Sequence, residues 1–150
     1  MLQRNNGVFA RHKHDCGQIP GEVLIEGPDP KPQRQYGFPR QEEGEVAKVI
    51  DSLLQTVLRR VASTNNAPIW PVKKVDGSWR LTVDYRELNK VTPLTAPTVA
   101  TSPVTMMRQG AQAKFFMVLD ISDGFWSIPL NWSCQYKFAF IFQGQQYTWI

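Results

Sequence analysis

Apolar residues recur at helical spacing in one stretch of the chain, residues 44–61. These positions follow one another in three- and four-residue steps and would form one face of a helix: Val46, Ile50, Leu53, Leu54, Val57, Leu58 and Val61. Glu42, Glu43 and Glu45 stand at its start, and Arg59 and Arg60 stand at its end, as the helix dipole favours. The pattern predicts an amphipathic helix over residues 44–61, followed by a turn.

Segments on either side of turn-forming dipeptides predict two β-hairpins. They are residues 68–75 with 78–84 around Asp76-Gly77, and residues 136–142 with 145–150 around Gln143-Gly144. An apolar run predicts a buried strand over residues 115–120 that ends in Asp120, followed by a turn or helix over 122–127. Short helices are expected at residues 85–90 and 104–109. This mixture of helices and antiparallel strands predicts the α+β class.

Residues 1–43 differ from the rest of the chain, because glycine, proline and polar residues dominate them. Pro28, Pro30, Pro32 and Pro39 bar a helix, so an extended connector is expected, with a short edge strand at residues 22–27. The full length of 150 residues fits one domain, and the hydrophobic content of 42% is enough for a core. Residues 44–150 are therefore the predicted folded domain.

The net charge of +4 is concentrated near the first hairpin. Residues 72–90 carry five cationic side chains against three anionic ones: Lys73, Lys74, Arg80, Arg86 and Lys90 against Asp76, Asp84 and Glu87. Such a cluster suits a polyanionic partner such as a nucleic acid. The alternative is structural, since lysines on an edge hairpin also keep it from pairing with other chains.

Cysteine use and hydropathy limit the class of protein. Cys16 and Cys134 are too far apart in sequence to suggest a disulfide-rich mini-fold, so free thiols are expected. No apolar run reaches the length of a membrane span and the N-terminus has no signal-peptide core, so an intracellular, cytoplasmic protein is expected. His12, His14 and Cys16 suggest zinc, but no fourth ligand stands at the usual spacing.

Two segments carry a resemblance to a known family. VKKVDGSWRLTVDYRELNK at residues 72–90 and FFMVLDISDGFWSIPL at residues 115–130 resemble the fingers and the first palm motif of retroviral-type reverse transcriptases. The likeness is strongest from residue 67 to residue 150, and residues 8–39 resemble the connector of endogenous retroviral Pol polyproteins. It implies the fingers (residues 44–110) and the start of the palm (residues 111–150) of a right-hand polymerase.

The resemblance also implies site residues. Asp120 would be the catalytic metal ligand for Mg²⁺ in the complete enzyme, with the backbone carbonyl of Ile121 as a further ligand. The alternative is that Asp120 or Ser122 only caps the next helix. The implied nucleotide-binding residues are Lys74 and Arg80 for the β and γ phosphates, Asp123 and Gly124 for the triphosphate through backbone amides, and Phe125 as the steric gate against ribose. The alternative for Phe125 and Trp126 is a place in the core.

The register of the first hairpin decides whether Lys74 and Arg80 can act together. A two-residue turn at Asp76-Gly77 would pair Lys74 with Trp79 and send Lys74 and Arg80 to opposite faces. A three-residue loop over residues 76–78 would put them opposite each other on one face, and we expect both to reach one cleft. Lys73, Arg86 and Lys90 are further candidates for nucleic-acid contact, although Asp84 with Arg86 favours a local ion pair.

The predicted function is that of an RNA-directed DNA polymerase segment, with a template-primer, deoxynucleoside triphosphates and the remainder of a Pol polyprotein as partners. The family's Tyr-x-Asp-Asp motif does not occur in these 150 residues, so this chain is not expected to polymerise alone. Marginal stability or aggregation is also expected, because the strand predicted over residues 115–120 would lack the neighbouring palm strands and expose its edge and apolar faces. The alternatives are a non-catalytic fingers remnant that binds nucleic acid and a structural fragment without that role.

Overall fold

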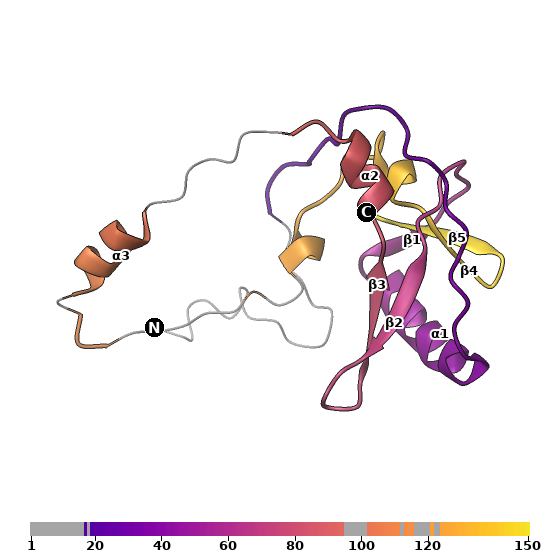
Figure 1. Cartoon of the computed structure of the whole chain (residues 1–150), viewed down its shortest axis with the longest axis horizontal. Helices are drawn as coiled ribbons and strands as arrows, with labels where there is room; N and C mark the ends of the chain where they lie inside the picture. The colour runs from indigo at the N-terminus through magenta and orange to yellow at the C-terminus, as the bar shows by residue number, and fades with distance from the viewer. Residues whose placement is uncertain (1–16, 18, 95–101, 112, 116–120, 122–123) are drawn as a thin grey trace.

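The computed structural model describes residues 17, 19–94, 102–111, 113–115, 121 and 124–150. Helices and antiparallel strands are mixed along the chain, which confirms the α+β class (Figure 1). The strands form two sheets, one of two strands in the order β2-β3 and one of three strands in the order β1-β5-β4. Within the described part of the chain, no helix is long and apolar enough to cross a membrane.

Helix α1 spans Arg40–Leu54, so it begins before the predicted start at residue 44 and ends well before residue 61. Pro39 precedes it, and Glu42 and Glu43 occupy its first turn. The chain then enters strand β1 (Leu58–Arg60), which pairs antiparallel with β5. The prediction that Arg59 and Arg60 close the helix was therefore wrong. Strand pairing with a distant segment overrides the helical spacing of the apolar residues there.

The first predicted hairpin is confirmed as strands β2 (Ile69–Lys73) and β3 (Trp79–Val83). Its register differs from both expected alternatives, because Val72 lies opposite Arg80 and Lys73 lies opposite Trp79. The amide of Lys74 donates to the carbonyl of Ser78 at 2.8 Å, which leaves residues 75–77 as the loop, with Gly77 at φ 82°. Lys74 and Arg80 therefore belong to the same face of the hairpin.

The second predicted hairpin consists of β4 (Phe140–Phe142) and β5 (Gln145–Trp149). Gln143 and Gly144 both have positive φ, 47° and 79°, as a type I′ turn requires. The prediction that the first strand begins at residue 136 was wrong, because Gln135–Phe138 forms the 3₁₀-helix η3. Three further elements agree closely with expectation: α2 (Arg86–Val91), α3 (Pro103–Gly110) and the 3₁₀-helix η2 (Gly124–Ser127).

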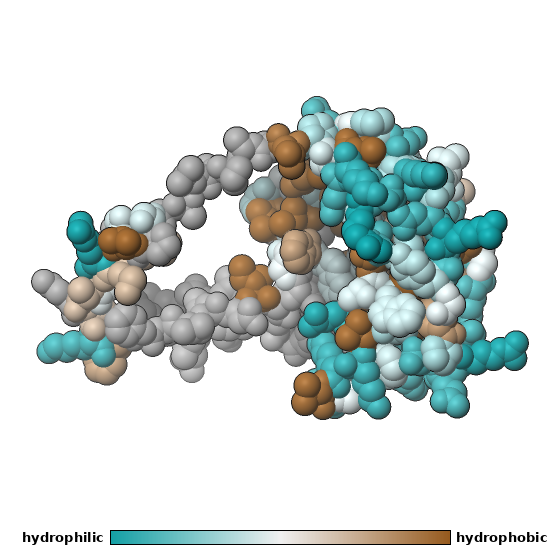
Figure 2. Space-filling model, viewed as in Figure 1, coloured by the Kyte–Doolittle hydropathy of each residue, from teal (hydrophilic) through white to brown (hydrophobic). Residues whose placement is uncertain are grey.

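The hydrophobic core lies between α1 and the two sheets. The apolar face of α1 buries Val46, Ile50 and Leu53 against residues of both sheets, among them Ile69 and Phe140. Hydrophilic side chains cover most of the outer face above these sheets (Figure 2). The apolar face of α1 therefore packs against both hairpins and joins them through one hydrophobic core.

Residues 19–39 form a segment that we call the strap, because it lies along the outside of the domain in irregular conformation. Figure 1 shows it arching over α2 and descending beside the strands to α1. The strand expected at residues 22–27 is reduced to one bridge between Val23 and Leu130. The buried Lys137 ammonium donates to the carbonyls of Ile25 and Gly27, at 3.4 and 2.5 Å. The strap is thus bonded to the domain rather than only leading into it.

Candidate functional site

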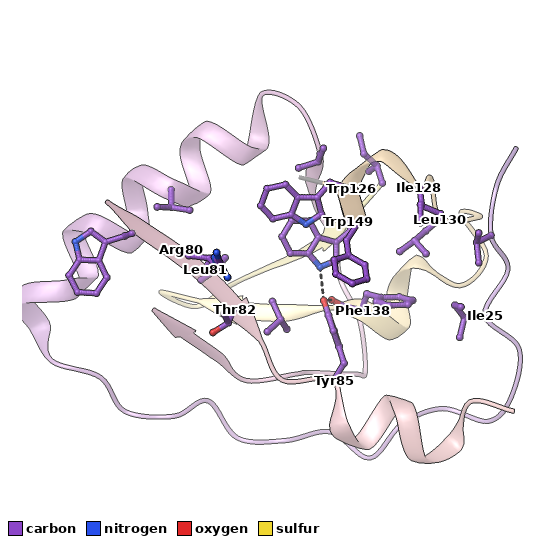
Figure 3. A pocket seen from close by; sticks show the side chains of 18 of the residues that line it. Ile25, Arg80, Leu81, Thr82, Tyr85, Trp126, Ile128, Leu130, Phe138 and Trp149 are labelled. Atoms are coloured by element: carbon purple, nitrogen blue, oxygen red, sulfur yellow. Dashed lines mark hydrogen bonds between the residues drawn. The ribbon is translucent and has the colours of Figure 1, made fainter. Parts of the chain in front are cut away.

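A cavity of about 680 Å³ opens between β3, η2 and the end of β5. Its walls are mostly apolar, and Figure 3 shows side chains of all three elements around it. Residues from the strap, such as Ile25, and the loop residues Ile128 and Leu130 close one side (Figure 3). It is the kind of concave, largely apolar space with a few polar groups that small ligands occupy.

Lys74 and Arg80 both line this cavity, as expected for side chains that share one cleft. Both residues are exposed, and among the described residues neither side chain forms an ion pair. Lys74 stands at the loop end of β2 and Arg80 lies within β3. The hairpin therefore presents the compact ammonium of Lys74 and the planar guanidinium of Arg80 on one face. Two exposed cations beside a largely apolar cavity form a site suited to an anionic ligand.

Gly124 and Phe125 of η2 line the same cavity. Phe125 has 92% of its surface exposed, whereas the neighbouring Trp126 stacks on Trp149 with ring centroids 5.1 Å apart. The alternative that both aromatics belong to the core was therefore wrong for Phe125 and correct for Trp126. The 3₁₀-turn separates the two rings, so that one faces solvent at the cavity while the other joins the packed layer.

Tyr85 forms part of the cavity wall beside Trp149, to which it is hydrogen-bonded (Figure 3). Its hydroxyl accepts from the indole Nε1 of Trp149 at 2.6 Å and donates to the carbonyl of Phe138 at 3.0 Å. Burial raises the pKa of Tyr85 above its ordinary value, and the bond from Trp149 opposes this shift. Its ring packs edge-on against Phe138, which confirms the prediction that Tyr85 is a packing group.

Asp84 and Arg86 form the local ion pair that the sequence favoured, with Arg86 Nη2 2.6 Å from Asp84 Oδ2. Hydrogen bonds from Arg86 lower the pKa of the Asp84 carboxyl well below its usual range, and the pKa of Arg86 is raised in return. A third residue, Tyr36 of the strap, donates its hydroxyl to Asp84 Oδ2 at 2.8 Å. No signal in the local sequence predicted Tyr36, because its partners lie nearly fifty residues away.

The remaining cationic candidates do not line the cavity. Lys73 lies over the ring of Trp79, 6.0 Å from its centroid, and Lys90 pairs with Glu87 at 2.6 Å. Arg59 donates its Nε to the side chain of Gln135 at 2.8 Å. Of the predicted contacts, the structure therefore brings together Lys74, Arg80, Gly124 and Phe125, and it places Lys73, Arg86 and Lys90 elsewhere.

The predicted metal ligand Asp120 and its neighbour Asp123 lie outside the described residues, as do His12, His14 and Cys16. Ile121 is described and is 73% exposed. In the part of the chain that the structure describes, no group of three or more His, Cys, Asp or Glu residues could hold a metal ion. Cys134 is a free, buried thiol, as expected.

Comparison with known proteins agrees with this arrangement. The family described as "Reverse transcriptase (RNA-dependent DNA polymerase)" matches residues 72–150, which include the basic hairpin and η2. The Pro-Pol polyprotein of Simian foamy virus type 1 is 40% identical over 121 residues, covering 80% of this chain. The chain spans only 10% of the length of that relative.

Solved structures show the same likeness over almost the whole chain. The crystal structure of Prototype Foamy Virus Protease-Reverse Transcriptase superposes with a TM-score of 0.79 at 34% identity, covering 99% of this chain and 20% of that one. The foamy viral protease-reverse transcriptase in complex with an RNA/DNA hybrid gives a TM-score of 0.76 at 31% identity, with the same two shares, 99% and 20%. The helices and hairpins described above are thus similar to the fingers and palm region of those enzymes.

Proposed function

The chain belongs to the reverse transcriptase family. From this premise we propose that its cavity binds the deoxynucleoside triphosphate in the active site of an RNA-directed DNA polymerase. The observation that supports the proposal best is the meeting of Lys74 and Arg80 with Gly124 and Phe125 around one cavity. The two pairs come from segments far apart in the chain. Each residue type suits its expected role there.

In this proposal Lys74 and Arg80 bind the β and γ phosphates. An ammonium and a guanidinium offer charge-assisted hydrogen bonds to phosphate oxygens, and the guanidinium can bind two of them at once. The backbone amides of Asp123 and Gly124 bind the same triphosphate. The exposed ring of Phe125 lies beneath the sugar, where a 2′-hydroxyl would collide with it, so deoxynucleotides are selected.

Enzymes of this family depend on divalent metal ions, and we propose Mg²⁺ for this chain in the complete enzyme. Asp120 and the backbone carbonyl of Ile121 would hold the ion, since Mg²⁺ takes oxygen ligands. When bound, the metal would stabilise negative charge on the reacting phosphate. The cationic and aromatic side chains around the cavity would bind and orient the nucleotide beside it.

The proposed partners are a template-primer of RNA or DNA and the remainder of a Pol polyprotein. The foamy viral protease-reverse transcriptase, a structural relative, forms a complex with an RNA/DNA hybrid, and this supports the first of these partners. Lys73, Arg86 and Lys90 are proposed as contacts to the nucleic acid. An intracellular, cytoplasmic location is part of the same proposal.

Titration calorimetry with a deoxynucleoside triphosphate and Mg²⁺ measures binding at the proposed site and so tests it. We expect Lys74→Ala and Arg80→Ala each to weaken binding roughly tenfold, because each removes a charge-assisted contact to phosphate. Lys48→Ala is the matched control, since Lys48 lies on α1 and pairs with Glu45. Equal affinity of all three variants and the parent chain would contradict the proposal.

A second candidate function is nucleic-acid binding without catalysis. The exposed cations of the hairpin favour it, because phosphate backbones bind such surfaces in a salt-dependent way. Binding of an RNA/DNA hybrid that weakens with salt and with Lys73→Ala, without any affinity for triphosphate, would favour this candidate. Template-dependent primer extension by a protein that includes this chain would instead favour the polymerase.

A further inference from the structure

Strand β2 has an outer edge that no other strand of the described chain covers, and the side chain of Gln35 occupies it. The bonds from Asp84 N to Pro68 O and from Lys74 N to Ser78 O, both 2.8 Å, turn the backbone groups of even-numbered β2 residues toward β3. The amide and carbonyl of Ile69 therefore point outward. Gln35 Oε1 accepts from Ile69 N at 2.9 Å, and Gln35 Nε2 donates to Ile69 O at 2.8 Å.

One side chain thus supplies both bonds that a neighbouring strand would give to Ile69, a residue with none of its surface exposed. The next outward-facing position of β2 is Pro71, which has no N–H to satisfy. The strap therefore satisfies the outward backbone groups of Ile69, and Pro71 has no N–H that would need an acceptor.

The next residue of the strap, Tyr36, contacts the hairpin at its base, which is the end away from the loop, where β2 begins and β3 ends. Its ring meets Trp70 edge-on, with centroids 6.4 Å apart, and its hydroxyl donates to Asp84 Oδ2 at 2.8 Å. Arg86 Nη2 donates to the same hydroxyl at 3.2 Å. Adjacent strap residues therefore bind β2 and the end of β3 at one level of the hairpin.

The strap is itself anchored on both sides of these contacts. Asn66 Nδ2 donates to the carbonyl of Gln33 at 2.7 Å, and the Gln33 amide donates to the carbonyl of Asn66 at 2.8 Å. Phe38 stacks on Phe142 with an interplanar angle of 8°. The hairpin base is consequently joined to β4 and to the loop before β2.

We propose that Gln35 and Tyr36 are positioning residues that fix the angle of the basic hairpin, and so the position of Lys74 and Arg80 at the cavity. The role in nucleotide binding rests on the proposed function. Lys74 stands five positions beyond Ile69, roughly 17 Å along an extended strand. Rotation of the base by about 5° would move the loop end by roughly 1.5 Å over that length. Displacements of this size weaken contacts that depend on geometry.

Spin labels on Val75→Cys at the hairpin loop and Arg60→Cys on β1, with Cys16→Ser, give a distance distribution that reports the hairpin angle. Cys134 is buried and stays in place. We expect Gln35→Ala and Tyr36→Phe each to broaden this distribution by roughly 1 Å or more. The same variants are expected to weaken triphosphate binding about three- to tenfold.

Two matched controls separate positioning from general effects. Gln41→Ala changes an exposed glutamine of α1, and Tyr136→Phe removes a strap contact to Asp29 that is away from the hairpin. Both should keep the narrow distribution of the parent chain. Circular dichroism establishes which variants fold, and Tyr36→Phe, which loses a single hydroxyl, serves if Gln35→Ala does not.

An unchanged distribution in a folded Gln35→Ala or Tyr36→Phe variant would overturn the positioning role. Failure of the proposed function has a different signature, because Lys74→Ala and Arg80→Ala would then leave triphosphate binding unaltered. The distance measurement needs no ligand, so it decides the role of the strap in either case.

Discussion

The indole nitrogen of Trp149 donates a 2.6 Å hydrogen bond to the hydroxyl of Tyr85. Trp149 ends β5 and Tyr85 follows β3, so the bond joins the two sheets across the cavity wall. The Tyr85 hydroxyl donates its own proton to the carbonyl of Phe138 at 3.0 Å. Removal of the Tyr85 hydroxyl would leave both the Trp149 donor and the Phe138 acceptor without this partner.

We expect Tyr85→Phe to lower the free energy of unfolding by about 1–3 kcal/mol, the usual cost of buried polar groups without partners. The pKa of Tyr85 is raised in the folded state, so its contribution is complete below the ordinary pKa of 10.0 and is lost as the pH rises above it. Chemical denaturation at pH 7 and above pH 10 measures both effects. Tyr147→Phe is the control, and an equally large alkaline loss in Tyr85→Phe and the parent chain would contradict the account.

Asp84→Asn tests the link between the strap and the hairpin. The substitution removes the charge that Arg86 binds and weakens the bond from Tyr36, so a loss of about 1 kcal/mol is expected at pH 7. Because the pKa of Asp84 is lowered in the folded state, its contribution is present above the ordinary value of 3.8 and is lost as the pH falls below it. The stability of Asp84→Asn should therefore fall less steeply in acid than that of the parent chain. Asp51→Asn, on the exposed side of α1, should keep the parent's acid dependence.

Phe125 and Trp126 should respond to alanine in opposite ways. Phe125→Ala is expected to change the free energy of unfolding by less than about 0.5 kcal/mol, because the ring is almost fully exposed. Trp126→Ala removes the stacking on Trp149 and should cost roughly 2 kcal/mol or more. In a protein with polymerase activity, Phe125→Ala should raise the use of ribonucleotides relative to deoxynucleotides. A large stability loss in Phe125→Ala would show that the ring packs in the fold.

Gly27 of the strap lies against Val91, the last residue of α2. A Cβ atom there would lie 2.4 Å from the carbonyl oxygen of Val91, and the φ of 107° disfavours any side chain. We expect Gly27→Ala to destabilise the chain by roughly 2 kcal/mol or more, because backbone must move. Gly44→Ala, inside α1 with open space around it, should instead stabilise by about 0.5–1 kcal/mol. Thermal melts of both variants give the comparison, and equal effects would argue against a close strap.

Local patterns predicted much of the fold. Asp76-Gly77 and Gln143-Gly144 located both hairpins, and the spacing of Asp84 and Arg86 predicted their ion pair. These features depend on residues close in sequence, whose own conformational preferences decide the outcome. The convergence of Lys74 and Arg80 on one cavity was also expected, although the exact register was not.

Features that depend on distant partners were not predicted. Leu58 fits a helical stripe as well as a strand, and only its pairing with Trp149 selects the strand. The strap was expected to be an extended connector, since its prolines exclude a helix but say nothing of Gln35 binding Ile69. Phe125 and Trp126 are neighbours of similar chemistry, so the difference in their exposure follows from the turn geometry of η2 alone.

The contacts of the strap also limit how early it can fold during synthesis. Its residues leave the ribosome before the partners that they bind, because Glu22 bonds to Asn131 and Phe38 stacks on Phe142, both far downstream in the chain. Contacts of such wide sequence separation form late and slowly. The strap must therefore wait, open to chaperones and proteases, until these downstream partners have emerged.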